Sequence, residues 1–199
     1  MIPQPGFGTD RNCSAHKQED VTMTTTTPAA ATTLHTAYQR SVAAYWNNNQ
    51  QDPVNLRLGD IDGLYHHHYG IGEYEPSVLE GSTDTRDDRI IKEMHRLETA
   101  QADLLLEHLG DISTDDRLLD AGSGRGGTSF MAHQRFGCQV DGVTISEYQV
   151  GFANNQAEQW GVADQVKFGF RNMLDTGFET GSRRGIWTNE TTMRLIQRS

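Results

Sequence analysis

The stretch Leu118-Leu119-Asp120-Ala121-Gly122-Ser123-Gly124-Arg125-Gly126-Gly127 passes from apolar residues through an acid into a turn with four glycines. A segment compatible with a helix follows at once, beginning Thr128-Ser129-Phe130. This order predicts a strand, a tight turn and a helix, the arrangement that holds a phosphate or nucleoside against a helix N-terminus. Glycine serves where φ is positive or where a Cβ would collide with a ligand. The alternative interpretation is an ordinary glycine-rich loop without a ligand.

Two classes of cofactor-binding protein use such a turn. Gly122, Gly124 and Gly127 also satisfy the G-x-G-x-x-G fingerprint of dinucleotide-binding proteins, and Asp141 follows where that fingerprint has its ribose-binding acid. Asp120, however, stands two positions before the first glycine, where the dinucleotide turn normally has a small or apolar residue. The pattern D-x-G-x-G-x-G resembles the first motif of S-adenosylmethionine-dependent methyltransferases. An NAD(P)-binding oxidoreductase is kept as the alternative.

Length, charge and cysteine content narrow the class of protein. The 199 residues suffice for one domain with a good core. The formal net charge of −10 argues against nucleic-acid or anionic-membrane partners, which attract clusters of Lys and Arg. The sequence contains no apolar run of membrane-spanning length and no signal-peptide pattern, which predicts a cytoplasmic protein. Cys13 and Cys138 form no C-x-x-C pair, so no disulfide framework is expected and Cys138 reads as a core thiol.

The chain divides into three predicted parts. Residues 1–35 lack apolar periodicity and are expected to be a disordered extension, with Met23 as an alternative start of translation. Residues 36–84 are expected to form a cap that covers the substrate, helical near 37–46 and irregular from about residue 55. Residues 85–199 are expected to form the cofactor-binding core. His66-His67-His68 does not predict a zinc site, because neighbouring side chains diverge.

Alternating elements predict the fold of that core. A helix over 85–109 is expected to pack on the sheet through Ile90, Met94, Leu97, Leu104, Leu105 and Leu109. Strands are expected over 117–121, 138–144 and 166–170 and from residue 185, with helices over 128–136 and 147–160 between them. The S-x-x-Q spacing of Ser146 and Gln149 predicts a capping box at the second of these helices. The pattern predicts an α/β fold with a doubly wound, mainly parallel sheet, and a ligand at the carboxyl ends of its strands.

A second motif makes the resemblance more specific. Residues 142–149 (Gly-Val-Thr-Ile-Ser-Glu-Tyr-Gln) resemble the second motif of methyltransferases related to cyclopropane fatty acid synthases and sterol C-methyltransferases. Within that group, residues 45–48, 55–72 and 172–175 resemble the geranyl diphosphate C-methyltransferases. The resemblance covers about residues 38–193 and implies a Rossmann-like class I methyltransferase fold. It also implies S-adenosylmethionine as cofactor and geranyl diphosphate as substrate, with 2-methylgeranyl diphosphate, a terpenoid precursor of 2-methylisoborneol, as product.

The resemblance assigns roles to two residues. Tyr69 matches the tyrosine whose ring and hydroxyl face the reacting carbons and take part in cation stabilisation and deprotonation. Glu190 matches a carboxylate beside that cation, acting as electrostatic stabiliser or base. Without the resemblance, Tyr69 would be interpreted as a half-buried packing residue and Glu190 as an exposed acid in a loop. The family also uses Mg²⁺ with the substrate diphosphate, whose oxygens are hard ligands, and no metal ligand is assigned in this sequence.

Further residues match cofactor-contacting positions of the family, and all of them lie at or just after the ends of predicted strands. They are Asp120, Gly122, Gly124, Thr144, Ser146, Gln149, Asn172, Met173 and Leu174. The first three belong to the glycine motif, where the acid lies near the cationic amino-acid end of the cofactor. The next three approach the ribose and the methionine end, and the last three lie beside the adenine.

The ending Arg194-Leu195-Ile196-Gln197-Arg198-Ser199 departs from the family pattern. The family implies a longer chain, so we interpret this ending as that of a gene fragment or a frameshifted product. A sheet that stops at its fourth strand is expected to leave an unpaired apolar edge. An inactive, marginally stable remnant of the enzyme is therefore the alternative to an active methyltransferase. Whether the chain forms the homo-oligomer that full-length members of the family can form is left open.

Overall fold

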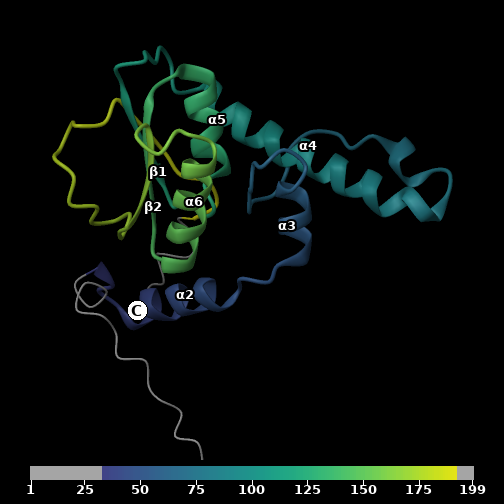
Figure 1. Ribbon diagram of the computed structural model, residues 1–199, viewed down its shortest axis with the longest axis horizontal. Coiled ribbons are helices and arrows are strands. Elements are labelled where there is room, and N and C mark those ends of the chain that lie inside the picture. The colour runs from purple at the N-terminus through teal and green to yellow at the C-terminus, as the bar shows by residue number, and fades with distance from the viewer. Residues whose placement is uncertain (1–32, 192–199) are drawn as a thin grey trace, which may run out of the picture.

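The computed structural model describes residues 33–191 (Figure 1). The predictions for residues 1–32, with Cys13 and Met23, and for the ending 192–199 concern segments outside the described residues. The described elements, in chain order, are α2 (Ala37–Asn48), α3 (Pro53–Gly59), η1 (Pro76–Leu79), η2 (Thr83–Thr85), α4 (Arg86–Glu107), β1 (Arg117–Ala121), α5 (Gly127–Phe136), β2 (Gln139–Thr144), α6 (Glu147–Gln159), β3 (Val166–Phe170) and β4 (Gly185–Trp187).

The four strands form one parallel sheet in the order β3-β2-β1-β4. In register, Asp120 lies between Gly142 of β2 and Trp187 of β4. Strands β2 and β3 follow β1 outward in one direction, whereas β4 lies on its other side. The strand order therefore reverses at β1, and ligands of open α/β sheets bind beyond the carboxyl ends of the strands at such a point. The predicted Rossmann-like, parallel sheet is confirmed, and among residues 33–191 it has four strands with helices packed on one face.

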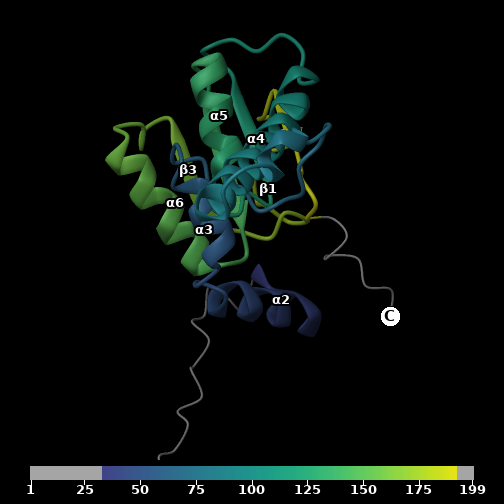
Figure 2. The ribbon, with the colours of Figure 1, turned by 90° about the vertical axis from the view of Figure 1, so that its right-hand side faces the viewer.

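Helices cover one face of this sheet. Figures 1 and 2 show α5 and α6 beside it, with one end of α4 adjoining α5. The main core joins these helices to the strands and includes Ala102, Leu106, Leu118, Phe130, Val140, Ala153, Val166 and Phe168. On the other face, Met173 and Phe178 pack against a smaller cluster of Leu119, Ala121 and Val143. The turn at the end of β1 is thus held between two packed layers.

Phe130 is the largest fully buried side chain and lies on the first helix after the glycine turn. Its ring centroid lies 4.9 Å from that of Trp160 and 5.5 Å from that of Phe168. Phe130→Ala is expected to destabilise the chain by about 3–5 kcal/mol, because it removes buried apolar surface and leaves a cavity. Chemical denaturation measures this change. Leu104→Ala, at a half-exposed position of α4, is the control and is expected to cost less than about 1 kcal/mol.

Two helices precede the core, and each begins with a side-chain cap. At α2 the side chains of Thr36 and Gln39 each accept a hydrogen bond from the other's backbone N–H, a full capping box. At α3 the carboxylate of Asp52 accepts the N–H of Asn55 at 3.2 Å, and Pro53 occupies the first turn. Residues 55–59 are therefore helical, which corrects the prediction of an irregular segment there. Residues 61–75 form neither helix nor strand.

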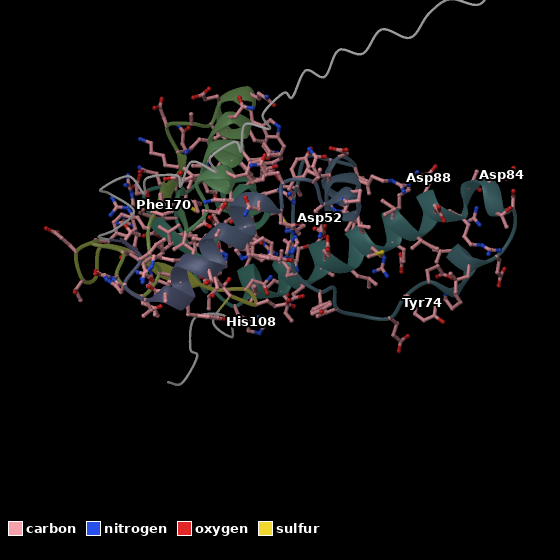
Figure 3. The ribbon with its side chains drawn as sticks, turned by 90° about the horizontal axis from the view of Figure 1, so that it is seen from below. Asp52, Tyr74, Asp84, Asp88, His108 and Phe170 are labelled. Atoms are coloured by element: carbon pink, nitrogen blue, oxygen red, sulfur yellow. The ribbon has the colours of Figure 1, made fainter. Side chains whose placement is uncertain are left out.

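Helix α4 runs where it was predicted, but its buried face differs from the prediction. Met94 and Leu104, expected to pack inward, are 40% and 44% exposed. The buried positions of the helix are His95, Glu98, Ala102 and Leu106. Figure 3 shows the end of the helix near Asp84 and Asp88 far from the sheet, so this part has no strand to cover. Of its buried polar residues, Glu98 lines the cavity described below, whereas His95 pairs with Asp62 at 2.9 Å.

Two further predictions concern membrane-spanning segments and the thiol of Cys138. No helix within residues 33–191 has the length and apolarity needed to cross a membrane. Cys138, directly before β2, is a free thiol and is fully buried in the main core, as predicted. Burial raises the pKa of this thiol above its usual value, so it is expected to behave as a packing residue and not as a nucleophile.

Candidate active site

One cavity of about 390 Å³ opens at the carboxyl ends of β1 and β2. Its walls come from α2 and α3, residues 65–69, the middle of α4, the glycine turn and the segments that follow β2, β3 and β4. Small-molecule sites have volumes of about 300–1,000 Å³, so the cavity has room for a ligand of that class. The predicted site residues that line it are Tyr69, Asp120, Gly122, Gly124, Thr144, Gln149, Met173 and Glu190.

Three predicted cofactor contacts, Ser146, Asn172 and Leu174, are absent from the cavity wall. Ser146 is fully buried at the N-cap of α6, where its hydroxyl accepts the N–H of Gln149 at 3.2 Å and donates to Asn47 Oδ1 at 2.9 Å. Asn172 is fully buried, and its side-chain carbonyl accepts the N–H of Leu174 at 3.0 Å. Leu174 is 61% exposed. Local hydrogen bonding accounts for the two polar residues, and their contact with a cofactor stays a prediction.

The glycine turn borders the cavity with its backbone. Gly122, Gly124 and Gly126 have φ values of 96°, 56° and 94°, in the left-handed region that glycine adopts without steric cost. A Cβ on Gly124 would meet no atom within 4 Å, whereas one on Gly122 would lie 2.4 Å from Thr191 Oγ1. Open space therefore lies beside Gly124, within a cavity that the turn itself lines. The turn fits S-adenosylmethionine, whose nucleoside needs a backbone without side chains beneath it.

Asp120 is the acid that distinguishes this turn from a dinucleotide turn. Its side chain is 3% exposed, and its Oδ2 accepts a hydrogen bond from Ser129 Oγ at 2.7 Å. Burial raises the pKa of Asp120 to about 7, although the hydrogen bond from Ser129 opposes the rise. The carboxyl group therefore exchanges a proton near neutral pH. Its bond to Ser129 also fixes the end of β1 against α5.

Asp120→Asn is expected to change how stability depends on pH. Because the pKa of Asp120 is higher in the folded chain than its ordinary 3.8, the folded state binds the proton more tightly, and this stabilisation is lost as pH rises from about 4 to 7. The wild type should lose up to roughly 4 kcal/mol relative to the variant across that window. Denaturation of both proteins at pH 4.5 and pH 8 measures the difference. An unchanged difference would contradict the raised pKa.

Thr144 and Gln149 are linked at the end of β2. Thr144 Oγ1 donates to Gln149 Oε1 at 2.7 Å, and both side chains are buried. The capping box predicted from S-x-x-Q is therefore half formed: Ser146 caps the helix, but the Gln149 side chain bonds to Thr144. This bond holds two predicted cofactor contacts together at the cavity wall.

The two predicted catalytic residues also meet at the cavity. The backbone N–H of Tyr69 donates to Glu190 Oε1 at 3.0 Å. Glu190 has a φ of 51°, the one positive value at a non-glycine residue within 33–191, and such strain is common at functional sites. Tyr69 is 79% exposed, so its ring is not the half-buried packing residue of the alternative interpretation. The hydrogen bond joins the segment after the histidines to the segment after β4.

Buried polar residues that the sequence analysis left unassigned line the same cavity. His66 is 3% exposed, and neither ring nitrogen has a hydrogen-bond partner among the described residues. Burial, with the nearby imidazoles of His68 and His95, lowers the pKa of His66 to about 3, so the ring is neutral at physiological pH. Glu98 of α4 is 6% exposed, and its Oε2 likewise has no partner there. His95, Glu98 and Ala102 are three and four residues apart and so share one face of α4. This spacing is the sequence signal that could have identified Glu98 as buried.

Arg125 is a further cavity residue, at a variable position of the glycine motif. It is 5% exposed, and its guanidinium lies 5.8 Å from the ring centroid of Tyr148 and 5.6 Å from that of Phe152. Its Nη2 donates to the carbonyl of Gln50 at 3.3 Å. A buried guanidinium in a cavity wall suits an anionic group of a ligand, such as a carboxylate or a phosphate. A charged residue inside a glycine turn is the sequence signal that could have found it.

Neither a protein-built metal site nor a dinucleotide site has support in the described residues. Within 33–191, no group of three or more His, Cys, Asp or Glu side chains is arranged to hold a metal ion. The Mg²⁺ expected from the resemblance would be held largely by the oxygens of the substrate diphosphate, so this finding concerns a site built from protein side chains alone. Asp141, the ribose acid of the dinucleotide alternative, is absent from the cavity wall and forms ion pairs with Arg183 at 2.7 Å and Arg117 at 3.6 Å.

The chain is similar in sequence to a known protein family and to named relatives. Residues 86–177 match the family model described as mycolic acid cyclopropane synthetase. A geranyl diphosphate 2-C-methyltransferase of Saccharopolyspora erythraea is 58% identical over 161 residues, which are 81% of this chain and 56% of that protein. The corresponding protein of Streptomyces coelicolor is 49% identical over 177 residues, covering 86% of this chain and 60% of that protein.

The chain is also similar to solved structures of proteins of the same kind as these relatives. The S. coelicolor geranyl diphosphate C-methyltransferase in complex with Mg²⁺, geranyl-S-thiolodiphosphate and S-adenosyl-L-homocysteine superposes with a TM-score of 0.77 at 50% identity. The match covers 80% of this chain and 58% of that one. The chain thus spans somewhat more than half the length of the curated relatives it matches. The chain thus has the Rossmann-like fold of S-adenosylmethionine-dependent methyltransferases, and it is similar to the geranyl diphosphate C-methyltransferases over somewhat more than half of their length.

Proposed function

We propose that this chain takes part in the S-adenosylmethionine-dependent methylation of C2 of geranyl diphosphate, giving 2-methylgeranyl diphosphate. The observation that carries the proposal is the hydrogen bond between Tyr69 and Glu190, 121 residues apart, in the wall of the cavity that the glycine turn borders. An aromatic ring and a carboxylate beside a cofactor cavity are the groups that methylation of an alkene requires. The relatives named above, which carry this activity in their names, give the substrate.

The reaction is demanding because an alkene is a weak nucleophile. S-adenosylmethionine, when bound, supplies an electrophilic methyl group on a positively charged sulfur. The π electrons of C2–C3 form the new bond to that methyl carbon, and the pair of the broken carbon–sulfur bond stays on sulfur. C3 is then a tertiary cation, and transfer of the C2 proton to a base, for which the Glu190 carboxylate and the Tyr69 hydroxyl are the candidates in the cavity wall, restores the double bond. The protein must align the two reactants, exclude water and stabilise positive charge.

The residues of the cavity wall can divide this work. The backbone of Gly122 and Gly124 leaves room for the cofactor, while Arg125 offers a cation to an anionic group of either ligand. Trp46 and Met173 supply apolar surface that excludes water. Glu190 supplies the negative charge that a carbocation needs, and the ring of Tyr69 supplies a π face.

We further propose a cytoplasmic enzyme with a small-molecule substrate and neither a nucleic-acid nor a membrane partner. The formal charge of −10 supports this, because phosphate-rich surfaces would repel it. We also keep the division into a cap of residues 36–84 and a core that begins at residue 85 as a proposal. Helices α2 and α3 contribute walls to the cavity, whereas the sheet and its helices hold the main core.

The test is transfer of a labelled methyl group. The purified chain is incubated with geranyl diphosphate and S-adenosylmethionine carrying a deuterated methyl group, and the products are dephosphorylated and analysed by mass spectrometry and NMR. We expect 2-methylgeraniol with the label on the carbon attached to C2. A label on oxygen, or no labelled prenyl product from a chain that binds S-adenosylhomocysteine, would contradict the proposal.

A further inference from the structure

The buried carboxyl group of Glu98 is a part of the cavity wall that the proposed reaction leaves unused. Glu98 lies on α4, far in sequence from the glycine turn, and lines the cavity with an oxygen that has no partner among residues 33–191. A buried carboxyl oxygen without a partner is costly, because the group has lost water and gained nothing in return. Such a group implies a ligand that completes it.

The backbone brings Glu98 close to the catalytic pair. A Cβ on Gly70 would lie 2.4 Å from Leu97 Cβ and 2.9 Å from the backbone nitrogen of Glu98, so only glycine permits this approach. The N–H of Ile71 donates to the carbonyl of Leu97 at 3.1 Å. The residues directly after Tyr69 are therefore held against α4 at Glu98. Gly70 explains why the segment after the histidines can share a wall with the middle of this helix.

Glu98 has a fully buried carboxyl oxygen, Oε2, without a hydrogen-bond partner among residues 33–191, and no oxygen of Asp52, Asp120 or Glu190 is in that position. Asp52 has both carboxylate oxygens bonded to Asn55, at 3.2 and 2.6 Å. Glu190 accepts the N–H of Tyr69, and Asp120 accepts the hydroxyl of Ser129. Burial, together with the negative charges of Asp52 and Glu190, raises the pKa of Glu98 to about 7. Glu98 therefore titrates near neutral pH, and a cation beside it would favour its ionised form.

We propose that Glu98 is a specificity-determining residue of the cofactor site, whose carboxyl group loses its proton when the sulfonium form of the cofactor binds and regains it when the sulfur has become a neutral thioether. The inference rests on the proposed function and deepens it. It explains how one cavity can hold S-adenosylmethionine well and release S-adenosylhomocysteine, because the two differ by one methyl group and one positive charge. The charge of the cavity then stays constant through the reaction.

Other ionisable groups face the same space and must be separated from Glu98 in the test. Those in the cavity wall are Glu190, Asp120, the imidazoles of His66, His67 and His68, the phenols of Tyr65 and Tyr69, and the guanidinium groups of Arg125 and Arg171, while Asp52 and His95 lie close behind it. Substitution of Glu98 alone isolates its share of any pH dependence. S-adenosylmethionine and S-adenosylhomocysteine differ in the acidity of their ammonium groups, because the sulfonium withdraws electrons, so the pH dependence due to Glu98 is the difference between the wild type and Glu98→Gln with the same two ligands.

The experiment is a set of calorimetric titrations of the chain with both ligands at pH 6 and pH 8. For the wild type we expect S-adenosylmethionine to bind about fivefold more tightly at pH 8 than at pH 6 relative to S-adenosylhomocysteine, as follows when binding lowers the pKa of Glu98 by about one unit from about 7. In Glu98→Gln this dependence should vanish, and the affinity for S-adenosylmethionine at pH 8 should fall by about tenfold. Binding of S-adenosylhomocysteine should change less than about twofold.

Two further variants distinguish the loss of the carboxyl group from a defect in folding. Glu98→Asp retains a carboxyl group and should keep the pH-dependent preference, although packing changes. Glu107→Gln makes the same substitution on the same helix at an exposed position near Arg135 and should leave both affinities unchanged. Thermal unfolding of each variant without ligand reports its folding.

The outcomes separate this inference from the proposed function. Equal weakening of both ligands in Glu98→Gln would assign Glu98 to packing alone and overturn the inference. An unchanged ratio in a chain that binds and methylates would also overturn it and leave the proposed function standing. A wild-type chain that binds neither ligand would overturn both.

Discussion

Gly127→Ala is expected to reduce methyl transfer to geranyl diphosphate by about a hundredfold or more, because it displaces one wall of the cavity from the other. A Cβ on Gly127 would lie 2.8 Å from His66 Nδ1 and 2.9 Å from the carbonyl carbon and oxygen of Tyr65. The backbone of Tyr65 cannot move away without moving the segment that leads to Tyr69. The glycine turn and residues 65–68, here called the histidine segment, therefore touch at this position. Steady-state kinetics with labelled S-adenosylmethionine measure the loss.

Gly151→Ala is the matched control for this prediction. Gly151 lies within α6, and a Cβ there would meet no atom within 4 Å. Alanine at an unhindered helical position stabilises a chain by up to about 1 kcal/mol, so this variant should be fully active and slightly more stable. If both variants keep wild-type activity, the contact between the glycine turn and the histidine segment has no part in catalysis.

Glu190→Gln is expected to lower kcat by about 10²–10³-fold while leaving the affinity for S-adenosylhomocysteine nearly unchanged. Glutamine keeps a carbonyl oxygen that can accept the N–H of Tyr69, now bonded to Glu190 at 3.0 Å, so the geometry of the wall is retained. The negative charge is lost, and with it the stabilisation of the carbocation. The loss should therefore appear in kcat and not in cofactor binding.

Kinetics and calorimetry on the same protein sample separate these two quantities. Glu179→Gln, at an exposed position of the loop before β4, removes the same charge away from the cavity and should be silent. A Glu190→Gln variant with wild-type kcat would show that the carboxylate serves only to hold Tyr69. A variant that loses cofactor binding as well would assign Glu190 to the fold of the wall.

The sheet and the glycine turn could be predicted from the sequence because their signals are local. The apolar run at Leu118 and Leu119, the acid and the glycines fix a strand and a turn within ten residues. Helices α5 and α6 follow from periodicity and from stops at Gly137 and Gly161, both with positive φ. The convergence of segments at the carboxyl ends of strands then follows from the parallel topology alone.

The part of the cavity wall formed by α4 and residues 65–71 could not be predicted in the same way. The periodicity of α4 favours Met94 and Leu104 as buried positions, but the helix extends past the sheet and buries His95 and Glu98. Burial there depends on residues 65–71, which have no periodic signal and approach α4 only because Gly70 lacks a side chain. Arg125 was missed for a related reason, since its aromatic neighbours Tyr148 and Phe152 come from another helix.

The proposed function requires that the glycine turn and the histidine segment together form a cavity for S-adenosylmethionine. Thermal unfolding of the chain with S-adenosylhomocysteine, and separately with NADH, tests it most directly. At a ligand concentration about 100 times the dissociation constant, binding to the folded state alone adds about 2.7 kcal/mol. We predict a rise in melting temperature with S-adenosylhomocysteine that NADH does not produce and that Gly127→Ala diminishes. No rise with S-adenosylhomocysteine, or an equal rise with NADH, would contradict the account.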